Sequence, residues 1–182
     1  MTTIPPLAEA LHGADLLHDR DALESRIAQM GRDIDASLAG ESAVMLTVMN
    51  GALVFAAQLA LAVTTDLQFD YAHATRYHDN RAGQLHWLRK PQVDLNGRSV
   101  LLVDDILDEG HTLAAVRDAC LDMGARRVLI ATLCVKDHDR RIAGIASDFN
   151  GVVVPDRYVF GYGMDYHEQG RNLPGIYALG AS

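Results

Sequence analysis

Hydrophobic residues alternate along the chain between helical spacing and continuous aliphatic runs. Between Asp21 and Gly40 the apolar residues fall on one helical face, which predicts an amphipathic helix: Leu23, Ile27, Met30, Ile34 and Leu38. Further helices are expected at 53–62 and 113–123. Aliphatic runs typical of strands buried on both faces are found at 43–49, 100–103, 128–135 and, more briefly, 152–154. This alternation predicts an α/β fold with a central, mostly parallel sheet.

Weaker patterns fill the remaining segments. Strands are expected at 65–75, 85–89 and 176–179, and the polar segment 76–85 is interpreted as a mobile loop between two antiparallel strands. Residues 2–18 are weakly patterned, and Pro5-Pro6 disfavours an early helix, so no element is predicted there. Asp21 and Glu24 are expected to form the capping box of the first helix.

An acidic turn follows one of these predicted strands. The aliphatic run 100–103 leads directly into Asp104 and Asp105, and Asp108 and Glu109 precede the flexible Gly110. A strand, a tight loop and a helix N-terminus together form a seat for phosphate, because backbone N–H groups point at the ligand. Four carboxylates beside such a seat suggest that magnesium lies between, or that the acids face sugar hydroxyls. The alternative is an ordinary acidic surface loop.

Composition narrows the possibilities. With 182 residues and neither repeats nor linkers, the chain is expected to be a single domain, 1–182. A net charge of −8 argues against nucleic acid as a partner. No apolar stretch is long enough to cross a membrane and no secretory signal is apparent, so we expect a cytoplasmic protein. Cys120 and Cys134 lie in apolar runs and are expected to be buried free thiols.

Two separate blocks carry a family resemblance. The stretch from Val100 to Thr112 resembles the phosphoribosyl pyrophosphate (PRPP) loop of type I phosphoribosyltransferases, and Pro155–Leu173 is similar to the purine-closing region of hypoxanthine-guanine phosphoribosyltransferases. The resemblance implies the type I phosphoribosyltransferase fold: a central, mostly parallel twisted sheet flanked by helices, with a small hood and a mobile antiparallel loop. Departures from the family pattern occur at Glu109, Asn50, Ala52 and Arg76.

The resemblance also implies a role for each matching residue. Asp108 would be the catalytic acid or base at purine N7. PRPP and its 5′-phosphate would be held by the turn formed by Asp104, Asp105, Ile106, Leu107, Asp108, Glu109, Gly110, His111 and Thr112. Pyrophosphate would contact Met49, Asn50, Gly51, Arg76, Tyr77 and Arg171. The purine would contact Lys136, Tyr158, Val159 and Asp165, and Mg²⁺ would be bound by Asp104, Asp105 and Asp165.

The implied activity is purine salvage, in which PRPP donates its phosphoribosyl group to N9 of a 6-oxopurine, giving IMP or GMP and pyrophosphate. Because an ammonium group only donates hydrogen bonds, Lys136 favours the 6-oxo group of hypoxanthine, guanine or xanthine over the 6-amino group of adenine. Family resemblance further suggests a homodimer or homotetramer. The alternatives are a phosphoribosyltransferase for another base and a regulator that senses ligands with the same fold. A P-loop NTPase is less compatible, since the sequence lacks the corresponding glycine-lysine loop.

Overall fold

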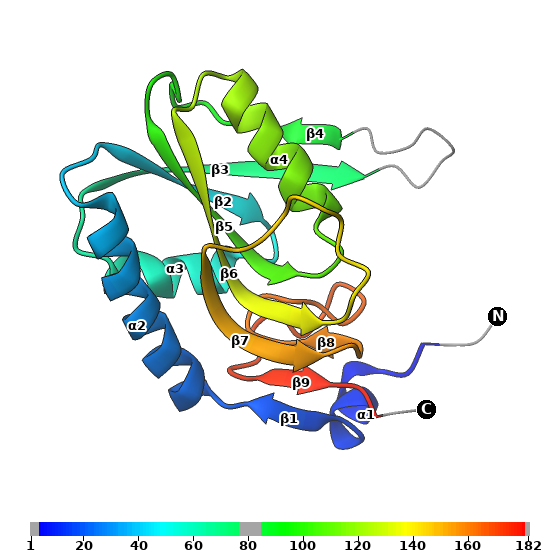
Figure 1. The fold of residues 1–182 in the computed structure, drawn as a ribbon. Coiled ribbons are helices and arrows are strands. Elements are labelled where there is room, and N and C mark those ends of the chain that lie inside the picture. The colour runs from blue at the N-terminus through cyan, green and yellow to red at the C-terminus, as the bar shows by residue number, and fades with distance from the viewer. Residues whose placement is uncertain (1–3, 77–84, 181–182) are drawn as a thin grey trace.

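A six-stranded sheet forms the centre of the computed structural model, which describes residues 4–76 and 85–180 (Figure 1). Its strand order is β4-β3-β2-β5-β6-β7. The strands are β2 (Ala43–Met49), β3 (Leu67–Arg76), β4 (Leu85–Arg89), β5 (Ser99–Leu107), β6 (Arg127–Asp137) and β7 (Phe149–Pro155). All neighbours pair in parallel except β3 and β4, which are antiparallel. The expected mostly parallel sheet is therefore confirmed.

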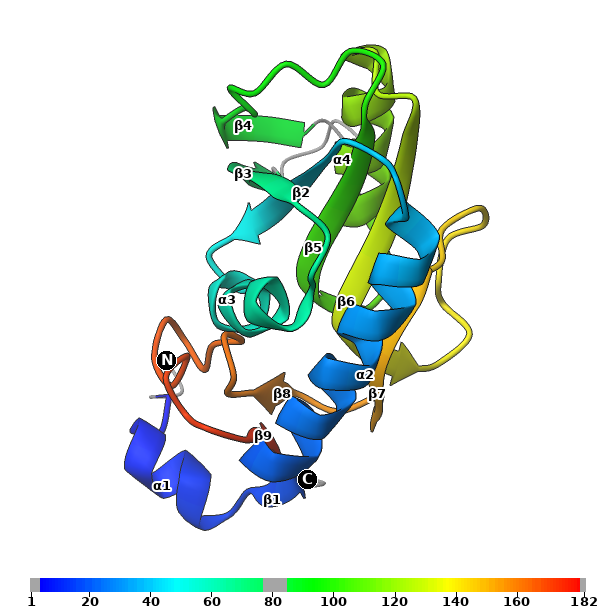
Figure 2. The ribbon, with the colours of Figure 1, turned by 90° about the vertical axis from the view of Figure 1, so that its left-hand side faces the viewer.

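Three helices cover the two faces of this sheet. Helices α2 (Arg20–Leu38) and α3 (Leu53–Ala62) lie on one face, and α4 (His111–Asp122) lies on the other (Figure 2). The face under α2 and α3 is filled by one cluster of buried side chains that includes Leu23, Phe55 and Leu101. The other face is filled by a second cluster around Leu102 and Val116. Because β5 contributes alternate side chains to both cores, its aliphatic run is continuous, as predicted.

A second, smaller sheet forms the hood. It has the order β1-β9-β8, all antiparallel, with β1 at Asp15–His18, β8 at Val159–Phe160 and β9 at Ile176–Ala178. Helix α1 (Leu7–His12) lies at its end (Figure 2). A third buried cluster of Ala10, Phe160 and Tyr166 joins α1 to this sheet. The hood expected from the family resemblance is therefore present.

Several local predictions from the sequence are wrong. The segment 2–18 contains α1 and β1, which pattern alone did not reveal because β1 has only four residues and pairs with β9, far along the chain. Helix α2 is capped by Asp19, whose Oδ1 accepts the N–H of Ala22 at 2.9 Å, and not by a box of Asp21 and Glu24. Strand β5 also runs through the acids to Leu107, where a loop was expected from Asp104.

Other expectations concern the two cysteines, the antiparallel strands β3 and β4, and membrane-spanning segments. Cys120 and Cys134 are free and buried, as predicted. The antiparallel strands β3 and β4 are observed, with Arg76 paired to Leu85, but the mobile loop predicted between them lies outside the described residues. None of the helices in the described ranges combines the length and apolar character needed to span a membrane.

Candidate active site at the carboxyl edge of the sheet

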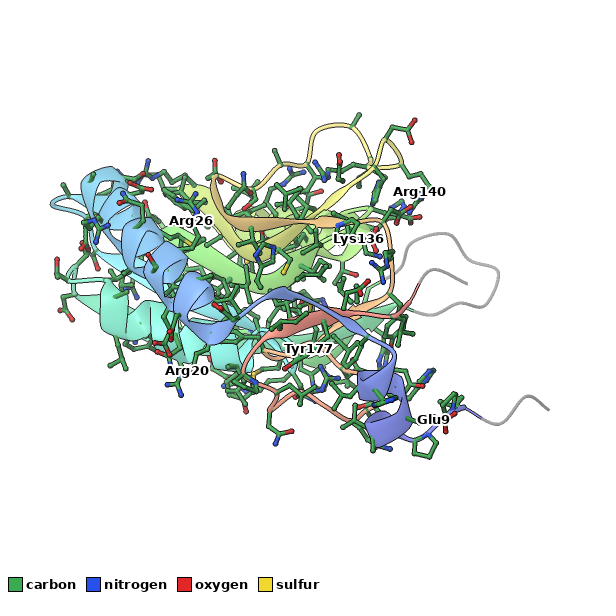
Figure 3. The ribbon with its side chains drawn as sticks, turned by 90° about the horizontal axis from the view of Figure 1, so that it is seen from below. Glu9, Arg20, Arg26, Lys136, Arg140 and Tyr177 are labelled. Atoms are coloured by element: carbon green, nitrogen blue, oxygen red, sulfur yellow. The ribbon has the colours of Figure 1, made fainter. Side chains whose placement is uncertain are left out.

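The parallel strands β2, β5 and β6 end at one edge of the sheet, where the chemically active side chains gather. Figure 3 shows Lys136 and Arg140, from the end of β6 and the loop after it, on the same side of the molecule. Carboxyl edges of parallel strands are the usual ligand sites of α/β folds, because the loops that leave them converge there.

Two adjacent acids lie near the carboxyl end of β5. Asp104 is buried, with 9% of its surface exposed, and its Oδ1 accepts the N–H of Asp105 at 3.0 Å. Burial and the neighbouring Asp105 carboxylate raise the pKa of Asp104 well above its usual value. Burial also raises the pKa of Asp105, although Arg171 acts in the opposite direction. Within the described ranges neither carboxylate has a salt bridge, so this pair of oxygen donors is suited to a cation.

A turn links these acids to helix α4. Gly110 is the N-cap of α4 and adopts a φ of +86°, a conformation that glycine reaches without steric cost. A Cβ at this position would also lie 2.5 Å from Ile145 Cγ2. The first turn of α4 leaves backbone N–H groups without partners inside the helix, directed at the same edge. The N-terminus of α4 is therefore suited to bind an anion, and it lies next to the acidic pair Asp104 and Asp105.

Two cavities lie at this edge of the sheet, and the larger of these two, of about 390 Å³, lies over this turn. Its walls come from the ends of β2 and β5, from the first residues of α4 and from Arg171. The Met49–Asn50 peptide at the end of β2 is cis. Gly51 lies so close to β5 that a Cβ would be 1.8 Å from Asp105 Oδ2, and a Cβ at Gly163 would be 2.0 Å from the Gly51 carbonyl oxygen. The turn after β2, which contains Gly51, is thus packed between Asp105 on one side and Gly163 of the hood on the other.

A smaller cavity of about 220 Å³ adjoins the first. Asp105, Ile106 and Asp108 line both cavities. The remaining walls of the smaller one are Lys136, Tyr158, Val159, Met164 and Asp165. The four residues predicted from sequence to contact a purine therefore meet around one space, next to the space predicted to hold PRPP.

Asp108 lies between two donors at the border of these cavities. Lys136 Nζ lies 2.9 Å from Asp108 Oδ2, and His138 Nε2 lies 2.6 Å from Oδ1. Partial burial alone would raise the pKa of Asp108, but the hydrogen bonds from Lys136 and His138 outweigh it and lower the pKa below its usual value. Asp108 is therefore an anion at neutral pH, with both oxygens already engaged.

Arg171 and Asp165 project from the hood. Arg171 Nη2 lies 2.9 Å from Asp165 Oδ1, and Nη1 donates to the Gly163 carbonyl at 2.9 Å. The Tyr158 hydroxyl donates to the Asp165 carbonyl oxygen at 3.1 Å, and its ring stacks on His167 with centroids 6.0 Å apart. Among the residues that the structure describes, no cluster of three or more potential metal ligands occurs. The predicted ligands Asp104, Asp105 and Asp165 thus do not form a closed protein cage.

Four of the predicted site residues do not line these cavities or lie outside the described side chains. The Leu107 side chain is 1% exposed and packs in the core beneath α4, so only its backbone could contact a ligand. Asn50 is exposed and does not line either cavity. Arg76 ends β3, but its side chain is not described, and Tyr77 lies outside the described residues.

Sequence reasoning missed His138. Its contact with Asp108 joins residues 30 positions apart, and no motif signals such a pair. The available signal was weak: His138 follows Lys136 by two residues at the end of a buried strand whose neighbour ends in acids.

Comparisons with known proteins agree with this geometry. Residues 13–169 match the model of the phosphoribosyl transferase domain family. A hypoxanthine-guanine phosphoribosyltransferase from Streptococcus pneumoniae is 32% identical over 90% of this chain and 92% of its own length. The bifunctional protein TilS/HprT from Listeria innocua is 33% identical over 92% of this chain, which spans only 26% of that longer protein. The crystal structure of a hypoxanthine phosphoribosyltransferase from Staphylococcus aureus superposes with a TM-score of 0.86 at 27% identity, covering 91% of this chain and 90% of that one.

Proposed function

Because this chain belongs to the phosphoribosyl transferase domain family, we propose that it is a purine-salvage enzyme that transfers the phosphoribosyl group of PRPP to N9 of a 6-oxopurine. The products are IMP or GMP and pyrophosphate. The observation that supports this most directly is the pair of adjoining cavities, because their shared wall of Asp105, Ile106 and Asp108 lies where a ribose would join a phosphate-bearing group to a base.

The larger cavity is suited to PRPP. Its 5′-phosphate would accept hydrogen bonds from the backbone between Asp108 and Thr112, at the N-terminus of α4. The ribose hydroxyls would face Asp104 and Asp105, and the pyrophosphate would lie toward Gly51 and Arg171. With a net charge of −8, the whole protein does not attract an anionic substrate, so these local donors must do so.

Magnesium fits the donor set of this cavity. Mg²⁺ in phosphoryl sites is usually held by one or two carboxylates together with substrate oxygens, which suits a pair of acids outside any closed cage. Asp104 and Asp105 would hold such an ion, and Asp165 would hold a second one by exchanging its contact with Arg171. The metal would neutralise charge on the leaving pyrophosphate.

The smaller cavity is suited to the base. Tyr158 would stack on the purine, the Val159 backbone would bind its edge and Lys136 would donate to O6. Lys136 has three donor hydrogens, so it can contact O6 while it keeps Asp108 Oδ2. Asp108 would take the proton from N7, which makes N9 a better nucleophile; such proton transfers are typically worth about 10²–10⁴-fold.

Nucleotide formation tests this proposal. We expect the protein with PRPP and magnesium to convert at least one of hypoxanthine, guanine and xanthine, and to lose this activity when magnesium is omitted. Adenine would place a donor against Lys136 at a cost on the order of 1–3 kcal/mol, so its kcat/KM should be roughly 10- to 100-fold lower or worse. Equal kcat/KM for adenine and hypoxanthine would disprove the role of Lys136, and product from none of the four bases would disprove the function.

Three properties expected from the sequence stay predictions: the cytoplasmic location, the single domain of residues 1–182, and the homodimer or homotetramer.

A further inference from the structure

His138 is a buried imidazole with both ring nitrogens engaged. Its side chain is 4% exposed. The backbone N–H of Arg140 donates to Nδ1 at 3.1 Å, and Nε2 lies 2.6 Å from Asp108 Oδ1. Because an N–H can only donate, Nδ1 must be the acceptor. The ring proton therefore lies on Nε2, and His138 donates to Asp108.

The loop that carries His138 is fixed on both sides. The N–H of Ile142 donates to the Glu109 carbonyl at 3.0 Å, and Arg141 Nη2 donates to the Lys136 carbonyl at 2.9 Å. Arg140 forms two hydrogen bonds with Asp156, of 2.6 and 2.8 Å. This loop is thus anchored to the turn after β5 and to the end of β7, which holds the imidazole at a defined place relative to Asp108.

The two oxygens of Asp108 have different surroundings. Within the described part of the chain, Oδ1 contacts only the His138 side chain, whereas Oδ2 contacts Lys136, which also lines the smaller cavity. Other charged groups lie nearby without replacing either contact: Arg141 Nε is 3.5 Å from the Asp108 carbonyl, Asp156 is 3.9 Å from Lys136 Nζ, and Glu109 is 3.9 Å from Arg140 Nε. His138 is thus the donor that restrains the carboxylate at Oδ1, on the side away from Lys136.

We propose that His138 is a positioning residue for the transfer reaction: its Nε2–H holds Oδ1 of Asp108 so that Oδ2 is the oxygen presented to the purine. This inference rests on the function proposed above. It makes His138 neither a ligand of the substrate nor a proton carrier. Its contribution is to orient the carboxylate and to keep it ionised.

Two substitutions separate the contact with Asp108 from the support of the loop. In His138→Asn the short amide can still accept the N–H of residue 140, an ordinary turn contact for Asn, but cannot reach Asp108. In His138→Gln the amide N–H₂ can reach the position of Nε2 and donate to Asp108, while the contact at Nδ1 is lost. The two variants therefore each remove one of the two bonds of the ring.

The carboxyl ¹³C resonance of Asp108, assigned with Asp108→Asn, reports its pKa in the ligand-free protein. We expect this pKa to rise by about 0.5–1 pH unit in His138→Asn, because one donor to the anion is lost, and to stay near the wild-type value in His138→Gln. The acid limb of the pH profile of kcat/KM for hypoxanthine should move the same way, since the base is protonated at higher pH in His138→Asn.

The outcomes are distinct. A wild-type pKa and acid limb in His138→Asn, or equal shifts in both variants, would overturn the positioning role and leave His138 as support for the loop. If the wild-type protein forms no nucleotide, the proposed function fails, whereas the NMR titration still tests the contact of His138 with Asp108. Should His138→Asn fail to fold, His138→Ser takes its place, because its hydroxyl can also accept the N–H of residue 140.

Discussion

At the residue scale, Gly51 is important for the side chain that it lacks. A Cβ there would overlap Asp105 Oδ2, at 1.8 Å, and Gly51 is not among the glycines with a positive φ. Glycine is therefore required at this position because Asp105, 54 positions away in the sequence, leaves no room for a side chain. Sequence inspection identified both residues as site residues but could not show that they touch.

The substitution Gly51→Ala tests this close approach. The added methyl group should push the Asp105 carboxylate into the larger cavity, so kcat/KM for PRPP should fall by roughly 100-fold, since small displacements of reacting groups are that costly. Melting temperature should change little, because a cavity lies beside the carboxylate. Gly13→Ala is the matched control, as a Cβ there meets nothing within 4 Å. Full activity of Gly51→Ala would contradict the close packing.

Site residues could be predicted from the sequence where they are consecutive in the chain, and not where they come together only in the fold. The acids from Asp104 to Glu109 with Gly110 could be recognised because strand, acids and helix start follow one another in the chain. His138 could not, because its role comes only from a contact that β5 and β6 bring about by pairing.

At the element scale, Asp70 connects the edge strand β4 to its neighbour β3 through hydrogen bonds. It lies on β3 and accepts hydrogen bonds from Arg89 Nη1 of β4 at 2.8 Å and from the N–H groups of Gln92 and Val93 at 2.5 and 3.0 Å. Burial would raise the pKa of Asp70, but these hydrogen bonds outweigh it and lower the pKa to about 2. One carboxylate thus ties β3, β4 and the segment after β4 together.

Asp70→Asn should reveal this as a pH-dependent loss of stability. Because the folded-state pKa is depressed, the contribution is present above about pH 4 and disappears as the pH falls toward about 2. We expect the free energy of unfolding in urea to drop by about 1–2 kcal/mol at pH 7 and by clearly less at pH 3. Asp66→Asn, at an exposed aspartate just before β3, serves as the control. An equal loss at both pH values would show that the charge is not responsible.

Element-scale prediction was reliable where burial set the pattern and poor where a single contact did. The strands β2, β5 and β6 were predicted correctly, because both of their faces are buried and their sequences are therefore continuously aliphatic. The start of α2 was misplaced because Asp19 and Asp21 are both plausible caps, and the choice rests on one hydrogen bond to Ala22.

At the scale of the whole molecule, the site is divided between two sheets. The main sheet supplies the turn from Asp104 to Thr112 together with Lys136, and the hood supplies Tyr158, Val159 and Asp165. PRPP would therefore depend mainly on the large sheet, with Arg171 of the hood at its pyrophosphate, and the base would depend on the hood together with Lys136.

Phe160→Leu tests this division. Phe160 is fully buried beside Tyr166 and Tyr177 and directly follows Val159 in β8. Shortening it should cost about 1 kcal/mol and loosen the hood, so the KM for hypoxanthine should rise by roughly 3- to 10-fold while the KM for PRPP stays within about twofold. Ile34→Val in α2, with a similar expected cost, should leave both values unchanged. Equal increases in both KM values for Phe160→Leu would argue against separate contributions.

The sequence by itself determined the alternation of helices and strands, the parallel character of the central sheet and the acidic segment from Asp104 to Glu109 before helix α4. These are local properties, since burial on both faces and a strand–turn–helix order leave their pattern in consecutive residues. Only the tertiary structure decided that α1 and β1 complete the hood, that Asp105 rests on Gly51 and that His138 holds Asp108. Each of these joins residues from 30 to more than 150 positions apart, and such contacts exist only after the strands have paired.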